Sequence, residues 1–356
     1  MMCLDYESQR GQQVTDTLRW GIIGTGTIAG DFAQALQSSS KCDVVSAAGS
    51  SPAKASLFAE RFKLPDSSAS IDALLTEDGI DAVYIATPHP MHAAHALACI
   101  DAGKAVLCEK PITIDTAGAE RVIASARDKG VFLMEAYMYR CHPMMREVID
   151  KLKSGAIGTL RHVRSDFGFY MPRQSEHRLF NPKLGGGGIL DVGGYPASLA
   201  RLIAGIVVDK PFDEPSEIDA AGHIGPTGVD ELAIAHLRFE SGLTAQLTCA
   251  IHQDVGTGTW VYGDQGVLHL PDPWTPQGDR HGRTSRYSIT PHDGEPTWFE
   301  VSTQLATYAI EAELVAASLP ATQAPAPAMG WDDTLGNMRL LDRWREQVGL
   351  PAMATV

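Results

Sequence analysis

The sequence predicts an α/β protein of two domains: an N-terminal doubly wound parallel sheet, and a C-terminal α+β domain with a largely antiparallel sheet. Three observations support this prediction. The chain has 356 residues, which is more than one small core accommodates. Strand-like apolar runs alternate with helical patterns over residues 18–140, as in a parallel sheet. Over residues 141–356, long strand-like segments follow one another, separated by turn residues.

The elements of the first domain follow from apolar runs and helix-end residues. Pro52 opens one helical pattern and Gly103 closes another, in the positions where these residues favour helix ends. Strands are expected over residues 18–24, 43–48, 81–87, 105–108 and 131–137, and helices over residues 28–37, 52–62, 91–103 and 115–130.

The second domain begins with a helical pattern and continues with strands. The helix is expected over residues 142–155, and a last helix over about 332–348, which we allow to pack back on the first domain. The strands are expected over residues 159–170, 231–240, 243–252 and 259–270. Residues 1–17 are polar and are interpreted as an N-terminal arm.

Composition excludes several classes of partner. The net charge is −14, which argues against binding to nucleic acid. No stretch approaches the roughly 18 apolar residues of a membrane span, and the N-terminal arm lacks the apolar core of a signal peptide. Six cysteines without a CxxC pair favour reduced thiols. We therefore expect a cytoplasmic protein without a nucleic-acid or membrane partner.

A glycine-rich turn between the first strand and the first helix predicts a nucleotide site. Gly24-x-Gly26-x-x-Ala29 has the spacing of the dinucleotide fingerprint of Rossmann domains. Gly24 permits the tight turn, Gly26 lets the backbone approach a diphosphate, and the helix that starts at Thr27 and Ile28 presents its N-terminus to that anion. The alternative is a glycine-rich turn without a ligand.

The end of the second strand favours NADP over NAD. An acidic residue there would bind the ribose hydroxyls of NAD, but the sequence has Ser50, Ser51 and Lys54 instead. Two hydroxyls and an ammonium suit a 2′-phosphate. The alternative is an ordinary Ser-Pro helix start with a lysine in solvent.

Five sequence blocks together resemble a known family, the Gfo/Idh/MocA oxidoreductases, over nearly the whole chain. These NAD(P)-dependent enzymes act mostly on sugars and cyclic polyols. The last two blocks are most similar to the branch of glucose–fructose oxidoreductase, dimeric dihydrodiol dehydrogenase and the bacterial xylose dehydrogenases. The blocks are GIIGTGTIA, ATPHPMH, EKP at 109–111, MEAYMYRCHP at 134–143 and GGGGILDVGGY at 185–195.

The resemblance implies a catalytic set drawn from both domains. Lys110 would be the catalytic lysine; the alternative is a lysine paired with Glu109 at a sheet edge. Asp191 and Tyr195 are four residues apart, so a helix places them on one face. The resemblance implies that Tyr195 is the acid/base and that Asp191 holds substrate, whereas periodicity alone would favour a core aromatic. Gly185 to Gly188 would let the helix approach the nicotinamide, or would form a flexible turn.

The electrostatic interaction of Lys110 with Tyr195 would be strong enough to bring the pKa of the tyrosine close to neutral pH, if the two side chains meet. The ordinary pKa of tyrosine is near 10, about 3 units above neutral, which corresponds to roughly 4 kcal/mol. An ammonium at about 4 Å contributes roughly that much at an effective dielectric constant of about 20. We therefore expect Lys110 to lower the pKa of Tyr195.

Other residues of the blocks are expected at the same cleft. The cofactor side would include Thr87, Pro88, His92, Glu109, Lys110 and Arg178, and the substrate side Lys110, Arg140, His142, Asp191 and Tyr195. His89, His92 and His95 lack a completing ligand, so no metal site is expected. His89 departs from the asparagine that is more usual in the family.

The leading hypothesis is an NADP-dependent oxidoreductase of cyclic sugars, which would oxidise the anomeric hydroxyl or reduce a sugar carbonyl. Its cofactor would either exchange or stay bound and cycle between two sugars. One alternative is a trans-dihydrodiol dehydrogenase. Another is a non-catalytic regulator that senses NADP(H). The resemblance also implies a homodimer formed through the sheet of the second domain.

Overall fold

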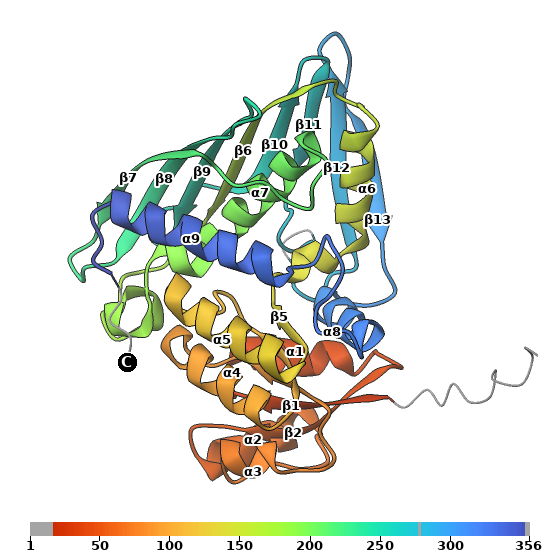
Figure 1. Cartoon of the computed structure of the whole chain (residues 1–356), viewed down its shortest axis with the longest axis vertical. Coiled ribbons are helices and arrows are strands. Elements are labelled where there is room, and N and C mark those ends of the chain that lie inside the picture. The colour runs from red at the N-terminus through yellow and green to blue at the C-terminus, as the bar shows by residue number, and fades with distance from the viewer. Residues whose placement is uncertain (1–16, 277–278, 353–356) are drawn as a thin grey trace, which may run out of the picture.

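The computed structural model describes residues 17–276 and 279–352. It contains two β-sheets, a five-stranded sheet in the N-terminal domain and an eight-stranded sheet in the C-terminal domain (Figure 1). The predicted arm lies outside the described residues except for Thr17, and Cys3 lies outside them as well. The cysteines within the described ranges are free thiols.

The first sheet is parallel, as predicted, with the strand order β2-β1-β3-β4-β5. The order reverses direction between β1 and β3, and doubly wound sheets bind ligands at such a point. The strands are β1 (Leu18–Ile23), β2 (Cys42–Ala48), β3 (Ala82–Ile85), β4 (Ala105–Cys108) and β5 (Leu133–Glu135). The helices are α1 (Thr27–Leu36), α2 (Pro52–Phe62), α3 (Ile71–Leu75), α4 (His92–Asp101) and α5 (Thr116–Lys129).

The second sheet is antiparallel except where β6 pairs with β9 in parallel. Its strand order is β13-β12-β11-β10-β6-β9-β8-β7. The sequence did not suggest β7, β12 or β13. The strands are β6 (Leu160–Gly168), β7 (Glu217–Ile224), β8 (Asp230–Arg238), β9 (Thr244–Ala250), β10 (Thr257–Gly263), β11 (Gly266–Leu270), β12 (Thr284–Pro291) and β13 (Thr297–Ser302).

Three helices lie on one face of the second sheet: α6 (Pro143–Lys153), α7 (Gly194–Val207) and α9 (Trp331–Gln347) (Figure 1).

One helical stretch, Pro182–Val207, is long and apolar enough to cross a membrane, although the sequence analysis expected none. An 18-residue window within it is 94% buried inside the protein. We interpret it as the core helix of the second domain. The connections contain the short turns η1 (His89–Met91), η2 (Met138–Cys141), η3 (Arg178–Phe180), η4 (Pro182–Leu184) and η5 (Ile189–Gly193).

The C-terminal part of the chain returns to the first domain. Helix α8 (Thr307–Ser318), which was expected to belong to the second domain, buries Tyr308 against Phe32 of α1, with the ring centres 6.4 Å apart. Helix α9 also contacts the first domain, because the Asp342 carboxylate accepts a hydrogen bond from Thr116 N at 2.9 Å. These contacts of α8 and α9 hold the C-terminal part of the chain against the first domain.

Candidate active site

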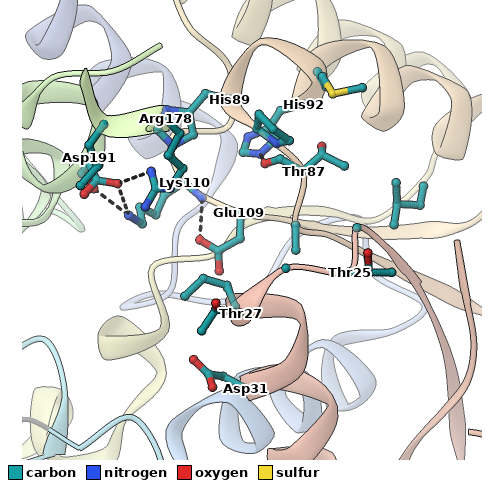
Figure 2. Close-up of a pocket in the computed structure, with 18 of the residues that line it drawn as sticks. Thr25, Thr27, Asp31, Thr87, His89, His92, Glu109, Lys110, Arg178 and Asp191 are labelled. Carbon is teal, nitrogen blue, oxygen red and sulfur yellow. Dashed lines mark hydrogen bonds and ion pairs between the residues drawn. The ribbon is translucent and has the colours of Figure 1, made fainter. Parts of the chain in front are cut away.

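A cavity of about 1200 Å³ lies between the carboxyl edge of the first sheet and the second domain. Figure 2 shows side chains that line it, which come from the ends of β1, β3 and β4, from α1 and α4, and from the turns η1, η3 and η5. The predicted residues that line it are Gly24, Gly26, Thr27, Ile28, Ser50, Thr87, Pro88, His92, Glu109, Lys110, Arg178, Asp191 and Tyr195.

The glycine-rich turn opens onto this cavity. Gly24 has φ +113°, and a Cβ there would lie 2.6 Å from the carbonyl oxygen of Ala86, so only glycine fits. A Cβ on Gly26 would meet no atom within 4 Å, and a side chain would therefore occupy the cavity. Helix α1 starts at Thr27, so its free N–H groups face a space that suits a diphosphate.

The three residues predicted to contact a 2′-phosphate are arranged around the start of α2. Ser50 lines the cavity, and Lys54 Nζ donates to its hydroxyl at 3.1 Å. Ser51 instead caps α2 by accepting from Lys54 N at 3.3 Å. Ser51 therefore has the helix-capping role that was the alternative interpretation, whereas Ser50 and the ammonium of Lys54 remain together at the cavity rim.

Glu109 and Lys110 lie at the end of β4 and use different partners. The Glu109 carboxylate accepts from Tyr84 Oη at 2.5 Å and from Lys110 N at 3.2 Å. Burial raises the pKa of Glu109, and the neighbouring Lys110 ammonium opposes that rise. The Lys110 ammonium itself donates to the main-chain oxygen of Asp191 at 2.7 Å (Figure 2). This geometry contradicts the alternative in which Lys110 pairs with Glu109 through its side chain.

Asp191 lies in a π-helical turn, η5, that leads directly into α7. π-Helical turns occur often at functional sites. Buried Asp230 holds this turn by accepting from Ile189 N at 2.6 Å, and a Cβ on Gly187 would lie about 2 Å from the same carboxylate. Gly187 therefore serves close packing on Asp230, which neither of the two interpretations of the glycine run had foreseen.

The Asp191 carboxylate lies beside two cations of the cavity. Its Oδ1 lies 2.8 Å from Arg178 Nη1 and 3.9 Å from Lys110 Nζ. Burial alone would raise the pKa of Asp191, but Lys110 and Arg178 more than offset burial and lower it to about 2. Asp191 is therefore ionised at neutral pH. Arg178, predicted on the cofactor side, lies beside this carboxylate instead of the glycine-rich turn.

Tyr195 is only 7% exposed and lies among aromatic rings. Burial and the Glu109 charge raise its pKa well above the usual range, although Arg280 opposes them. Lys110 Nζ lies 5.1 Å from the centre of the ring and over its face. The expected lowering of the Tyr195 pKa by Lys110 is thus wrong, because the ammonium contacts Asp191 and the ring face, and burial dominates. Among the described residues, no group hydrogen-bonds to the Tyr195 hydroxyl.

An apolar wall faces Asp191 and Tyr195 and was missed by the sequence analysis. Trp274 stacks on Phe167 with ring centres 5.6 Å apart, and Phe169 and Met171 continue the wall. Phe167 near the end of β6 and Phe169 and Met171 after it are spaced two residues apart, and this two-residue period could have indicated one common face. Trp274 lies in the β11–β12 connection and had no comparable sequence signal.

The three histidines after β3 have separate protein partners. His89 Nδ1 is 3.1 Å from Gly185 O, and burial lowers the pKa of His89 to about 3, so its ring is neutral. Its proton must lie on Nδ1, since a carbonyl only accepts. His92 Nδ1 and Nε2 are 2.8 Å and 2.7 Å from the carbonyl oxygens of Pro111 and Thr87, and burial lowers the pKa of His92 to about 4, so the neutral ring donates to one of the two. His92, predicted to bind cofactor, lines the cavity with both ring nitrogens against main-chain oxygens.

The Thr87 side chain connects to the third histidine. Its hydroxyl lies 3.1 Å from His95 Nδ1. Within the described ranges no group of three His, Cys, Asp or Glu side chains could hold a metal ion.

Two predicted substrate-binding residues are not in the cavity. Arg140 is 1% exposed and its Nη2 lies 2.6 Å from Asp333 Oδ2, with its other nitrogens on the carbonyls of Pro327 and Ser198. Each of the three nitrogens of this guanidinium donates a hydrogen bond inside the core. His142 caps α6 by accepting from Met144 N at 3.2 Å. Both predictions were wrong because the η2 turn directs these side chains into the interior.

Comparison with known proteins agrees with this architecture. Residues 18–137 match the model described as "Oxidoreductase family, NAD-binding Rossmann fold", and residues 145–269 match the GFO/IDH/MocA C-terminal domain. The trans-1,2-dihydrobenzene-1,2-diol dehydrogenase of Mus musculus is 37% identical over 264 residues, covering 73% of this chain and 76% of the relative. The Xenopus laevis enzyme of the same name is 31% identical over 336 residues, covering 93% and 98%.

A solved structure extends the similarity over nearly the whole chain. A 3-ketoreductase from Actinomadura kijaniata, in complex with NADP and TDP-benzene, is 29% identical with a TM-score of 0.81 and covers 93% of this chain and 98% of its own. The same fold, the matching domain models and relatives above 30% identity agree. The chain belongs to the Gfo/Idh/MocA family of oxidoreductases.

Proposed function

We propose that this chain is an NADP-dependent oxidoreductase that interconverts a secondary alcohol and a ketone on a six-membered ring. The ring would carry a second, neighbouring hydroxyl, and the substrate class that fits best is a trans-dihydrodiol. The observation that carries this proposal is that Lys110, Asp191 and Tyr195 meet in the same cavity as the Gly24–Gly26 turn.

The residues present fit an NADP molecule. The open space above Gly26 and the N-terminus of α1 suit the diphosphate, while Ser50 and Lys54 at the rim suit the 2′-phosphate. The absence of an acidic residue at this position favours NADP over NAD. When bound, this cofactor supplies the acceptor or donor of a hydride. The protein then has to bind the ring, orient it and move one proton.

Tyr195 is the group we assign to the proton. Its raised pKa keeps the phenol neutral at physiological pH, so it can donate a proton to the oxygen of a ketone that is being reduced. In the oxidation direction the ionised Tyr195 oxygen must accept the proton that the substrate hydroxyl releases, and alkaline pH favours that ionised form. Ionised Asp191 would accept a hydrogen bond from the neighbouring hydroxyl, and Lys110 would hold Asp191 in place. These contacts orient the ring for transfer at one carbon.

The apolar wall favours a dihydrodiol. Phe167, Phe169, Met171 and Trp274 offer a large apolar surface opposite a few polar groups, which suits a ring with two adjacent hydroxyls and an unsaturated remainder. The two dihydrodiol dehydrogenases at 37% and 31% identity support the same choice. A cyclic sugar, our leading hypothesis from the sequence, is the second candidate, supported by the similar 3-ketoreductase.

The test is an activity assay with purified protein. We expect NADPH to form from NADP when trans-1,2-dihydrobenzene-1,2-diol is added, with faster turnover than for cyclic aldoses such as glucose or xylose. Faster turnover of an aldose would move the assignment to the sugar class. NADP binding without turnover of either class would support the regulator instead. Denaturing the protein and identifying any released nucleotide by mass would show whether the cofactor exchanges.

We also propose a homodimer through the face of the second sheet opposite α6, α7 and α9. Ile234 of β8, Trp260 of β10 and Trp298 of β13 lie on this face, and Trp298 is 46% exposed. Arg164 lies over the Trp260 ring and Arg286 over the Trp298 ring, and aromatic and arginine side chains are enriched at interfaces between copies. Light scattering should give the mass of two chains for the wild type and of one chain for Ile234→Glu. A monomeric wild type would contradict this proposal.

A further inference from the structure

Arg280 belongs to the second domain but reaches the first. It lies between β11 and β12, and its Nη1 is 3.2 Å from Asp31 Oδ2 on α1. His281 Nε2 lies 3.5 Å from the other oxygen of the same carboxylate. All three side chains line the cavity together with Gly26 and Thr27. The Arg280–Asp31 pair is therefore a contact between domains at the predicted diphosphate position.

The charges around this position are unfavourable for a dinucleotide unless a cation is added. Asp31 and Glu109 both line the cavity, and each would repel a diphosphate that approaches the N-terminus of α1. Among the described residues three Lys or Arg side chains line the cavity, and two of them, Lys110 and Arg178, are bonded to Asp191. Arg280 is the one that adjoins α1.

The Arg280 guanidinium has donors to spare. Within the described part of the chain, its one hydrogen bond is from Nη1 to Asp31, and its side chain is 48% exposed. A guanidinium presents five N–H groups in a planar fork that matches phosphate oxygens. The remaining N–H groups can therefore bind an anion while the bond to Asp31 is kept.

We propose that Arg280 binds the diphosphate of the dinucleotide and sets the rate at which the cofactor leaves. This assignment rests on the proposed dinucleotide cofactor. Because Arg280 comes from the second domain and the diphosphate would lie on α1 of the first, the bound cofactor joins the two domains. Release then requires the charged hydrogen bonds of Arg280 to break.

The test measures NADPH release by stopped-flow fluorescence and needs no substrate. We expect Arg280→Gln to release NADPH about 10- to 100-fold faster than the wild type, the worth of a charge-assisted hydrogen bond. Arg280→Lys keeps the charge without the fork and should show a smaller acceleration. Arg283→Gln is the matched control, because Arg283 is exposed on the same connection and does not line the cavity. It should release NADPH at the wild-type rate.

A double variant separates direct binding from simple neutralisation of Asp31. If Arg280 binds the diphosphate, Asp31→Asn combined with Arg280→Gln should still release NADPH quickly. Restoration of the wild-type rate in the double variant would show that Arg280 only neutralises Asp31 and would overturn the assignment. So would a wild-type rate for Arg280→Gln alone. A wild type that binds neither NADPH nor NADH would instead refute the proposed cofactor, and the assignment with it.

Discussion

The ammonium of Lys110 and the main-chain oxygen of Asp191 lie 2.7 Å apart, and this contact joins the two halves of the site. Lys110 follows β4 of the first sheet, whereas Asp191 lies in the π-helical turn before α7. The site therefore exists only when the two domains are packed together. A charged donor on a carbonyl is a strong hydrogen bond, so it also fixes how η5 faces the cavity.

Replacement of Lys110 should change both the rate and its pH dependence. We expect Lys110→Ala to lower kcat at least 100-fold, because Asp191 loses the contact that orients it. The pKa of Asp191, now about 2, should rise toward its ordinary 3.8, since a cation that lowers it is removed. Activity should then be lost at a higher pH on the acid side of the profile of kcat/KM. An acid limb in its wild-type position would contradict this role; exposed Lys183→Ala is the control.

The choice of cofactor should depend on Ser50. Ser50→Asp places a carboxylate where a 2′-phosphate would bind, beside the ammonium of Lys54. Like charges repel, so affinity for NADP should fall far more than affinity for NAD. Dissociation constants from titration calorimetry for both cofactors check this. A wild type that binds NAD as tightly as NADP would refute the cofactor assignment.

The Asp333 carboxylate should be essential to stability. It pairs at 2.6 Å with both Arg140 and Arg201, which are buried guanidinium groups. Asp333→Ala leaves both cations without this partner, and breaking a buried pair costs about 3–5 kcal/mol of unfolding free energy. The exposed Glu120 of α5 pairs with Arg339 at 3.2 Å, so Glu120→Ala should cost little. Urea denaturation measures both. Equal losses in the two variants would contradict the buried network.

Asp230 should make stability depend on pH. Burial raises its pKa from 3.8 to about 7, so between about pH 4 and 7 the folded protein holds a proton that the unfolded chain releases. The unfolding free energy should therefore fall as pH rises through this range. Asp230→Asn keeps an acceptor for Ile189 N. It should make the dependence of the unfolding free energy on pH shallower, by the amount that corresponds to the binding of up to one proton. Denaturation at several pH values tests this, with exposed Asp219→Asn as the control. An unchanged slope in Asp230→Asn would show that Asp230 does not titrate there.

The part of the site that could be predicted from the sequence lies at the carboxyl edge of the first sheet. In a parallel sheet, the ends of β1, β3 and β4 meet at one edge. The Gly24 turn, Thr87 and Lys110 follow these ends and therefore had to lie close together. The contact of Lys110 with Asp191 could not be derived in this way, because it depends on how the second domain docks.

Residues next to a motif were predicted less well. Arg140 follows β5 and looked like a ligand, but a short 3₁₀ turn can direct a side chain to either side, and here it points into the core. The aromatic wall and Arg280 come from a strand end and a connection of the second domain. The two-residue period of Phe167, Phe169 and Met171 indicates a common face, but no local pattern shows that this face, Trp274 or Arg280 lies opposite the glycine turn.

The central claim is that Tyr195 moves the proton, and one substitution tests it most directly. Tyr195→Phe removes a hydroxyl that has no hydrogen-bond partner among the described residues, so the fold and NADPH affinity should survive. The matched control is Tyr139→Phe, which removes a hydroxyl bonded to Ser198 Oγ at 2.6 Å away from the cavity.

The decisive measurement is kcat for ketone reduction at neutral pH, compared between Tyr195→Phe, Tyr139→Phe and the wild type. We predict a loss of about 10²–10⁴-fold for Tyr195→Phe, the usual contribution of a positioned proton donor, and near wild-type turnover for Tyr139→Phe. Tyr195→Phe that retains most of its activity, with NADPH still bound, would contradict the account and make Tyr195 a packing aromatic.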